Sequence, residues 1–326
     1  MKRLLQFWLR QLLLASRQSS RGFTLAELLI VSIVGSLIIT GLMTLTVQLL
    51  TTDRQEAVRL ETNREMQLAL DYMSTELREA VYVYTGDCLT NAGTCVGVDS
   101  RAIGNPATAI LPAGIAGANN VPVLAFWKQQ TIPDVLKTAC AAAPAATPLQ
   151  VGGVAVPCTS GSSYALVVYA LSTDNPGNTW EGGARIKRYV LQEFSQTGQR
   201  NTGYINPATQ ANRFVAWPGA GAVTRATGVP PILVDFVNGI PGGVVSCPGG
   251  YNISPSPAAL AGGGVPNTLR SFYACVSPFR DGQYQEVVVY LQGSVEGRGG
   301  GGVRPQDGRL STLQTRVLTR GVLDAR

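Results

Sequence analysis

The chain has 326 residues, of which 14% are charged, 37 are glycine and 19 are proline, and its formal net charge is +6. This length is sufficient for one long helix and one sizeable hydrophobic core, and the glycine and proline content favours a loop-rich, strand-rich domain. The chain contains no histidine, which excludes Ser–His–Asp and Cys–His catalytic arrangements and any zinc site with a histidine ligand.

Residues 1–22 form a basic leader without an acidic residue. Its positive charges are Lys2, Arg3, Arg10, Arg17 and Arg21. Removing these five charges leaves a net charge near +1, so the basic excess indicates membrane orientation, with this end in the cytoplasm, rather than a nucleic-acid surface. Two interpretations of the leader stay open: a cytoplasmic tail that is removed, and an interfacial helix anchored by Phe7 and Trp8.

Residues 23–50 form an apolar run of 28 residues in which Glu27 is the only charged side chain. As a helix the run would be ~42 Å long, more than a ~30 Å hydrocarbon core, so we expect it to span a membrane. A carboxylate is costly in lipid and therefore marks function. A plain single-pass anchor is the alternative. The small Gly22 in front of the run and the acid four residues after Phe23 both oppose it.

Residues 51–85 predict an amphipathic continuation of the same helix. Because no glycine or proline interrupts residues 42–85, we expect one helix over Phe23–Tyr84, with Gly86 as its C-terminal stop. Apolar side chains recur every three or four residues, at Met66, Ala69, Leu70, Met73, Leu77, Ala80, Val81 and Tyr84. The opposite face carries Arg64, Glu65, Asp71, Glu76, Arg78 and Glu79. The apolar stripe is expected to pack on a sheet.

Residues 86–326 predict a β-rich head beyond the membrane. The predicted strands are Pro122–Trp127, Tyr164–Leu171, Arg185–Phe194, Pro231–Val237, Ser271–Val276, Tyr284–Gln292 and Ser311–Leu318. The run VVVYL within Tyr284–Gln292 is typical of a buried central strand. No helical connector of ten or more periodic residues clearly separates these strands, so we expect an antiparallel sheet and an α+β fold.

All of the cysteines follow the apolar run. They are Cys88, Cys95, Cys140, Cys158, Cys247 and Cys275. An even number in an oxidising compartment favours disulfides, although six cysteines allow ~15 full pairings. Loop closure favours neighbours, which predicts Cys88–Cys95, Cys140–Cys158 and Cys247–Cys275, and free buried thiols are the alternative. Without histidine or a C-x-x-C pair, we expect no metal site and no cofactor.

The stretch RGFTLAELLI, residues 21–30, resembles the processing motif of the type IV prepilin family, Gly–Phe–Thr–Leu–x–Glu–Leu. The resemblance implies a long N-terminal helix packed on an antiparallel head. It implies that a prepilin peptidase cuts between Gly22 and Phe23 and methylates the new amino group of Phe23. It also implies that Glu27 meets the terminal amine of a neighbouring subunit.

The pairing of Glu27 has a physical basis of its own. An unpaired carboxylate costs at least ~2.5–3.5 kcal/mol in the middle of a membrane helix and less near the interface. Cleavage after Gly22 would create a cationic amine on Phe23 about one helical turn away. Pairing between neighbouring helices displaced along their axes would remove two penalties and fix the register. The alternative is that Glu27 reaches the cytoplasmic interface without a partner.

The remainder of the chain carries weaker resemblances. The segment ILVDFVNGI (Ile232–Ile240), the chain length and the large head are similar to the PilW group of minor pilins and to J-type pseudopilins of type II secretion. The segment Asn63–Gly86 is similar to a cyanobacterial subgroup linked to hormogonium polysaccharide secretion. Major pilins are usually about half as long, which favours a minor subunit.

Two classes of function follow. The first is a structural subunit that initiates or tips a filament for pilus assembly or secretion, and the second is a surface-binding module at the filament tip. An anchored enzyme is the weakest alternative, because the absence of histidine removes the commonest catalytic bases, although paired carboxylates such as Asp235 and Glu286 remain conceivable. The expected partners are the prepilin peptidase, other pilins or pseudopilins, an inner-membrane assembly platform and membrane lipid, with no nucleic acid. We expect a single-pass inner-membrane protein with a periplasmic head that then joins a surface filament.

Overall fold

The computed structural model describes residues 23–90, 110–112, 114–117, 119–144, 147–210, 213–215, 217–218, 224–243, 245–256, 269–280, 283–298 and 308–321. The predicted leader lies outside these residues. The chain divides into two compact units, the first ending at Glu56 and the second covering Ala57–Arg326.

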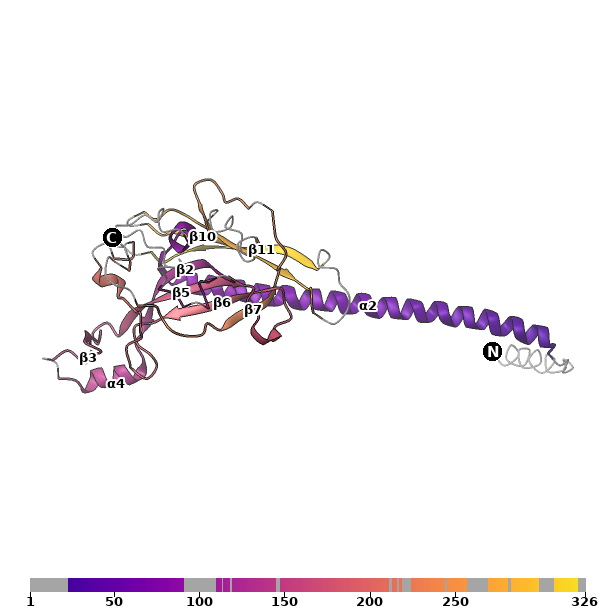
Figure 1. Ribbon diagram of the computed structural model, residues 1–326, viewed down its shortest axis with the longest axis horizontal. Coiled ribbons are helices and arrows are strands. Elements are labelled where there is room, and N and C mark those ends of the chain that lie inside the picture. Colours follow the sequence, from indigo (N-terminus) through magenta and orange to yellow (C-terminus); the bar gives the residue numbers. More distant parts are fainter. Residues whose placement is uncertain are drawn as a thin grey trace, which may run out of the picture. The chain divides into compact units, whose positions relative to one another are not determined.

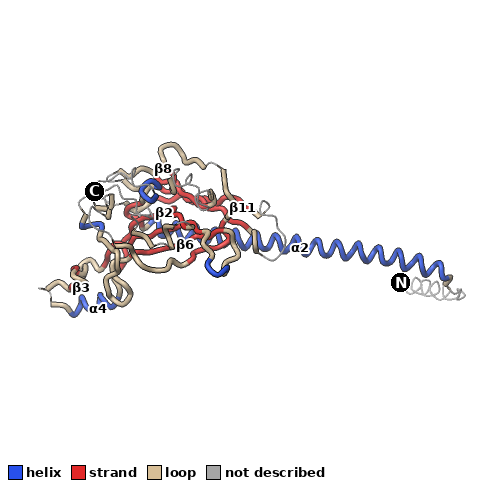
Figure 2. Tube along the Cα trace, viewed as in Figure 1, coloured by secondary structure: helices blue, strands red, loops and turns tan. Residues whose placement is uncertain are grey.

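The first element, α2 (Leu25–Arg78), contains residues of both units (Figures 1 and 2). It is the one helix in the described residues that is long and apolar enough to cross a membrane. Hydroxyl groups in its apolar half donate to carbonyls one turn back, such as Ser32 to the Leu29 carbonyl at 2.8 Å and Thr40 to the Ser36 carbonyl at 2.7 Å. These polar groups are therefore satisfied inside the helix, as a lipid environment requires.

The C-terminal end of α2 differs from the sequence prediction. The helix ends at Arg78 rather than at Tyr84, and Ala80–Val83 forms strand β1. This strand pairs antiparallel with β2 (Asn120–Thr131). The residues Ala-Val-Tyr-Val suit a strand as well as they continue the helical stripe, because β-branched and aromatic side chains pack well on a pleated sheet. The prediction of one helix through residue 84 was therefore wrong in its last six residues.

In the described residues, nine strands form one sheet in which every neighbouring pair is antiparallel. The order is β1, β2, β5 (Ser162–Ser172), β6 (Ala184–Leu191), β7 (Ile232–Val237), β10 (Glu286–Ser294), β9 (Phe272–Val276) and β8 (Asn252–Ser254), and β11 (Arg309–Leu318) also pairs with β10. All seven predicted strands are present, with ends that differ by a few residues. The predicted α+β class is confirmed.

Several short elements have no counterpart in the sequence prediction. They are the strands β1 and β8, the small hairpin of β3 (Gln150–Val151) and β4 (Val154–Ala155), the helices α3 (Gly86–Thr90) and α4 (Asp134–Ala142), and the single-turn helices η1 (Pro176–Asn178) and η2 (Pro207–Thr209). The strand β3 and its partner have only two residues each, too few for an alternating pattern.

The sheet consists of two leaves joined at one seam. A single residue pair, Gly293 with Val237, connects β10 to β7. The Asn238 amide nitrogen supports the seam by donating to the Gln292 carbonyl at 2.9 Å. A Cβ atom at Gly293 would lie 2.9 Å from Cγ of Met66, so the glycine permits the close approach of α2.

Hydrophobic clusters cover both faces of the sheet. On one face, Met66, Met73 and Leu77 of α2 are fully buried and belong to a cluster with inward-facing residues of both leaves, such as Phe126 and Val289. On the other face, Trp127, Leu166 and Val168 belong to a second cluster with Tyr84, Leu89, Phe214 and Trp217 from the segments between strands. The helical part of the predicted stripe, from Met66 to Leu77, therefore packs on the sheet as expected, whereas Val81 and Tyr84 belong to the second cluster.

Two disulfides lie among the described residues of the head, Cys140–Cys158 and Cys247–Cys275. They are the second and third of the neighbour pairings that the sequence predicts. Cys88 is buried, and Cys95, its predicted partner, lies outside the described residues, so that pairing stays a prediction.

Candidate functional site

The start of α2 brings together Phe23, Thr24 and Glu27. The Thr24 hydroxyl accepts a hydrogen bond from the Glu27 amide nitrogen at 3.3 Å, and Oε2 of Glu27 lies 3.5 Å from the Thr24 amide nitrogen. This reciprocal arrangement is a capping box, in which two side chains satisfy amide groups that the helix itself leaves without partners. Glu27 also lies near the positive end of the helix dipole, where a carboxylate is favoured.

Thr24 was not singled out from the sequence, although the signal was present. Thr-Leu-Ala-Glu at residues 24–27 is the Ser/Thr-x-x-Glu pattern that precedes an apolar helix. Gly22 and the bond to be cut lie outside the described residues. Phe23 and Glu27 are both exposed; Phe23 lies two residues before the start of α2, and Glu27 lies in its first turn.

Apolar side chains of α2 are exposed throughout the first unit. Among residues 23–56, only Gly35 is even half-buried, and side chains such as Leu25, Leu37 and Met43 are more than half exposed. Such a continuous apolar surface on a water-soluble monomer would aggregate. The first unit therefore requires lipid or other apolar helices around it.

Within the second unit, a buried carboxylate fixes α2 to the sheet. Glu76 is 6% exposed, and its oxygens accept hydrogen bonds from Nε and Nη2 of Arg188 at 2.8 and 2.7 Å, and from the hydroxyl of Tyr169. Nζ of Lys128 lies 2.8 Å from its Oε1. The prediction that Glu76 belongs to the solvent face of the helix was wrong, because partners from strands far away in the sequence neutralise it.

Burial alone would raise the pKa of Glu76, but these partners oppose it. Hydrogen bonds from Arg188, Lys128 and Tyr169 lower the pKa of the carboxyl from 4.5 to about 2. Burial lowers the pKa of Arg188 and hydrogen bonding to Glu76 raises it, with a net rise. Glu76 and its three partners therefore hold the helix against the sheet, and we call this cluster the lock at Glu76. The partners leave no open position on the carboxylate for a reacting molecule.

The two carboxylates named as conceivable catalytic groups have separate partners. Oδ1 of Asp235 lies 3.3 Å from Nε of Arg185, and Glu286 forms an ion pair with Arg316. Among the described residues, no group of three or more His, Cys, Asp or Glu side chains is arranged to hold a metal ion.

Residues 17–43 match the family model of the prokaryotic N-terminal methylation motif. The match includes Gly22, Phe23 and Glu27, and the α+β layout is consistent with the type IV pilin fold. Together these observations support a type IV pilin-like protein. The motif implies processing by a prepilin peptidase and assembly with other pilins, and the apolar helix fits membrane anchoring followed by incorporation into a filament. No curated protein and no solved structure was found to match the chain.

Proposed function

We propose that this protein is a minor pilin or pseudopilin, a structural rather than catalytic subunit that initiates or tips a type IV pilus-like or secretion filament. The observation that carries the proposal is the coincidence of the methylation motif with an exposed apolar helix whose first turn contains one acid. Its length supports a specialised subunit, because major pilins are usually about half as long.

Assembly would give the Glu27 carboxylate a new partner on a neighbouring subunit. Among the described residues, the Glu27 carboxylate accepts hydrogen bonds from the amide nitrogen and the hydroxyl of Thr24, at 3.5 and 3.4 Å. Cleavage at Gly22 gives Phe23 a cationic amine, and a neighbouring helix displaced along the axis would place that amine beside the acid. Pairing the cationic amine with the carboxylate offsets the cost of burying either charge alone, so the pair favours the assembled state.

The proposed orientation in the membrane rests on the charges of the leader. We propose that the chain is inserted with residues 1–22 in the cytoplasm and the head in the periplasm, because the leader holds the positive charges. It would engage the inner-membrane assembly platform and other pilins or pseudopilins. Support for polysaccharide secretion and motility is the more specific form of the proposal.

N-terminal mass spectrometry of the membrane fraction and of sheared surface filaments tests the proposal. We expect a chain that begins at methylated Phe23 in both fractions, and Gly22→Leu should leave the full-length precursor in the membrane. Recovery of wild-type protein that still carries Met1, in cells with active peptidase, would contradict the proposal.

Substitution of the acid tests the pairing step separately. Glu27→Ala should be processed normally but be absent from sheared filaments, whereas Glu56→Ala, an exposed acid on the same helix, should be incorporated. Normal incorporation of Glu27→Ala would refute the pairing role. A deletion strain that keeps its filaments but loses attachment to surfaces would favour the tip-binding alternative over an assembly role.

A further inference from the structure

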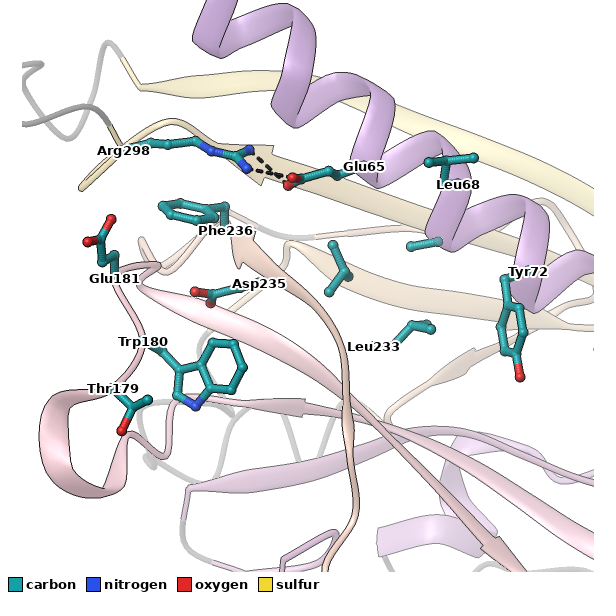
Figure 3. A pocket seen from close by; sticks show the side chains of 12 residues that line it. Glu65, Leu68, Tyr72, Thr179, Trp180, Glu181, Leu233, Asp235, Phe236 and Arg298 are labelled. Atoms are coloured by element: carbon teal, nitrogen blue, oxygen red, sulfur yellow. Dashed lines mark hydrogen bonds and ion pairs between the residues drawn. The ribbon is translucent and has the colours of Figure 1, made fainter.

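An open groove of about 630 Å³ lies on the second unit, between α2, β7 and the loop that precedes β6 (Figure 3). Tyr72 and Leu68 of α2 line one side, and Trp180 and Glu181 line the other. Phe236 and Arg298 lie near the end where Glu65 of α2 approaches (Figure 3). The pilin motif makes no use of this groove, and the lock at Glu76 contacts it through Arg188, whose guanidinium lies 5.5 Å from the centre of the Tyr72 ring.

A β-bulge forms the floor of the groove. Ala184 of β6 pairs with Val237 and Ile186 pairs with Val234, so β7 has one more residue than β6 between these pairs. Within the extra length, Phe236 has φ 57°, a left-handed conformation that is rare for a bulky side chain. Bulges and strained residues of this kind concentrate at functional sites, where they direct a side chain.

The side chains of Arg185 and Asn175 hold the loop that carries Trp180 in place. The buried guanidinium of Arg185 donates to the Gly182 carbonyl at 2.9 Å and to Oδ1 of Asp235 at 3.3 Å. The side chain of Asn175 accepts from the Trp180 amide nitrogen at 3.0 Å and donates to its carbonyl at 2.8 Å. The backbone of Trp180 is therefore fixed, while the residue remains 38% exposed. Its side chain thus offers a preorganised surface for binding.

The charges around the groove are largely neutralised. Nη1 of Arg298 donates to Oε2 of Glu65 at 2.8 Å, and its guanidinium lies 4.6 Å from the centre of the Phe236 ring. Asp235 is paired with Arg185. Within the part of the chain that the structure describes, the carboxylate of Glu181 has no hydrogen-bond or ion-pair partner.

From this lining we propose that the groove binds a neutral oligosaccharide. The rings of Trp180 and Tyr72 lie on opposite sides of the groove and offer apolar surface to the C–H faces of sugar rings (Figure 3). The carboxylate of Glu181 and the indole N–H of Trp180 can accept from and donate to hydroxyl groups. An anionic ligand would find Arg298 already occupied, and a cationic peptide would find only Glu181 unneutralised.

Binding is tested with the purified chain from Phe23 to Arg326, in a detergent without a sugar headgroup. The probes are cellotetraose, maltotetraose and chitotetraose, with tetralysine as the competing ligand class. We expect saturation transfer from the protein to at least one oligosaccharide and a blue shift of Trp fluorescence on titration, because the other described tryptophans, Trp127 and Trp217, are buried. Affinity should change less than about twofold between low and high salt.

Variants assign the binding to this groove. Trp180→Ala should weaken association at least about tenfold, whereas Trp180→Phe should retain most of it. Tyr284→Ala removes an aromatic ring that is 63% exposed elsewhere on the head and should have no effect. Glu181→Gln should weaken binding only a few-fold, because the amide oxygen still accepts a hydroxyl.

Three results would overturn the inference: no saturation transfer to any of the three sugars, equal binding by Trp180→Ala and wild type, or tighter and strongly salt-dependent binding of tetralysine. The test does not depend on the proposed filament role, because purified protein binds or fails to bind whether or not it assembles.

Discussion

Substitution of Glu76 by glutamine should destabilise the head more than any single charge change on its surface. The substitution keeps the shape of the side chain but leaves Arg188 as a partly buried cation without a counter-charge, and Lys128 with only the exposed carboxylate of Glu79. Removing one partner of a buried ion pair typically costs ~3–5 kcal/mol. For a domain of this size the melting temperature should fall by roughly 5–15 °C.

The pH dependence gives an independent measure of the same contact. The pKa of Glu76 is about 2 in the folded protein and 4.5 as the reference for the unfolded chain, which corresponds to at most ~3 kcal/mol. Because the folded-state pKa is the lower one, this stabilisation is complete above pH ~4.5 and is lost as the pH falls toward ~2. The wild type should therefore lose stability across this window, and the glutamine variant should lose less.

Circular dichroism melts of the processed protein, recorded between pH 2 and pH 7, provide the assay. The matched control is Glu79→Gln, which removes a carboxylate bonded to the same Lys128 at 3.0 Å but 57% exposed. An exposed pair contributes ~0–1 kcal/mol, so this control should melt within a few degrees of the wild type. Equal melting temperatures for the two variants, or an unchanged pH slope in Glu76→Gln, would refute the role of Glu76 as a buried lock.

Two further substitutions test the packing of the head. Gly182→Ala would place a Cβ atom 2.5 Å from Oδ1 of Asp235, so we expect the free energy of unfolding to fall by ~1–3 kcal/mol. The control Gly249→Ala meets no atom within 4 Å and should be neutral. Equal melting temperatures for the two variants would contradict the close packing of the loop at Gly182. Joint replacement of Cys247 and Cys275 by serine opens a link across 28 residues and should cost roughly 3–4 kcal/mol in denaturant unfolding, and an unchanged midpoint would show that the disulfide does not stabilise the head.

The sheet was largely predictable from the sequence because its strands are long, β-branched and aromatic. Strands such as Ser162–Ser172 and Glu286–Ser294 are rich in valine, leucine and tyrosine, so pattern and propensity agree. The end of α2 was not predictable in the same way. Residues 80–84 satisfy a helical stripe and a strand propensity equally, and tertiary pairing with β2 decides between them.

The site at the start of α2 was predictable because all of its parts are contiguous in sequence. Glu76 was misplaced for the opposite reason, since Lys128, Tyr169 and Arg188 reach it from three different strands. A charge on a helix is ordinarily assigned to solvent, and only the fold supplies the cations that permit its burial. The groove likewise combines segments more than 100 residues apart, and no local pattern marks it.

The seam between β7 and β10 has a mechanical consequence if the protein is pulled through α2, as the proposed filament role implies. In the described residues, one residue pair and its flanking bonds join the two leaves at this seam. Gln285 and Ser254 of one leaf also bond to Val83 and Val123 of the other, and the helix from Ala57 onward packs on side chains of both leaves. A force that enters through this helix is therefore shared by both leaves and acts on their contacts in shear. Many contacts must then break at the same time. The seam therefore does not carry the load alone, so a pulling force on α2 would not separate the two leaves one residue pair at a time.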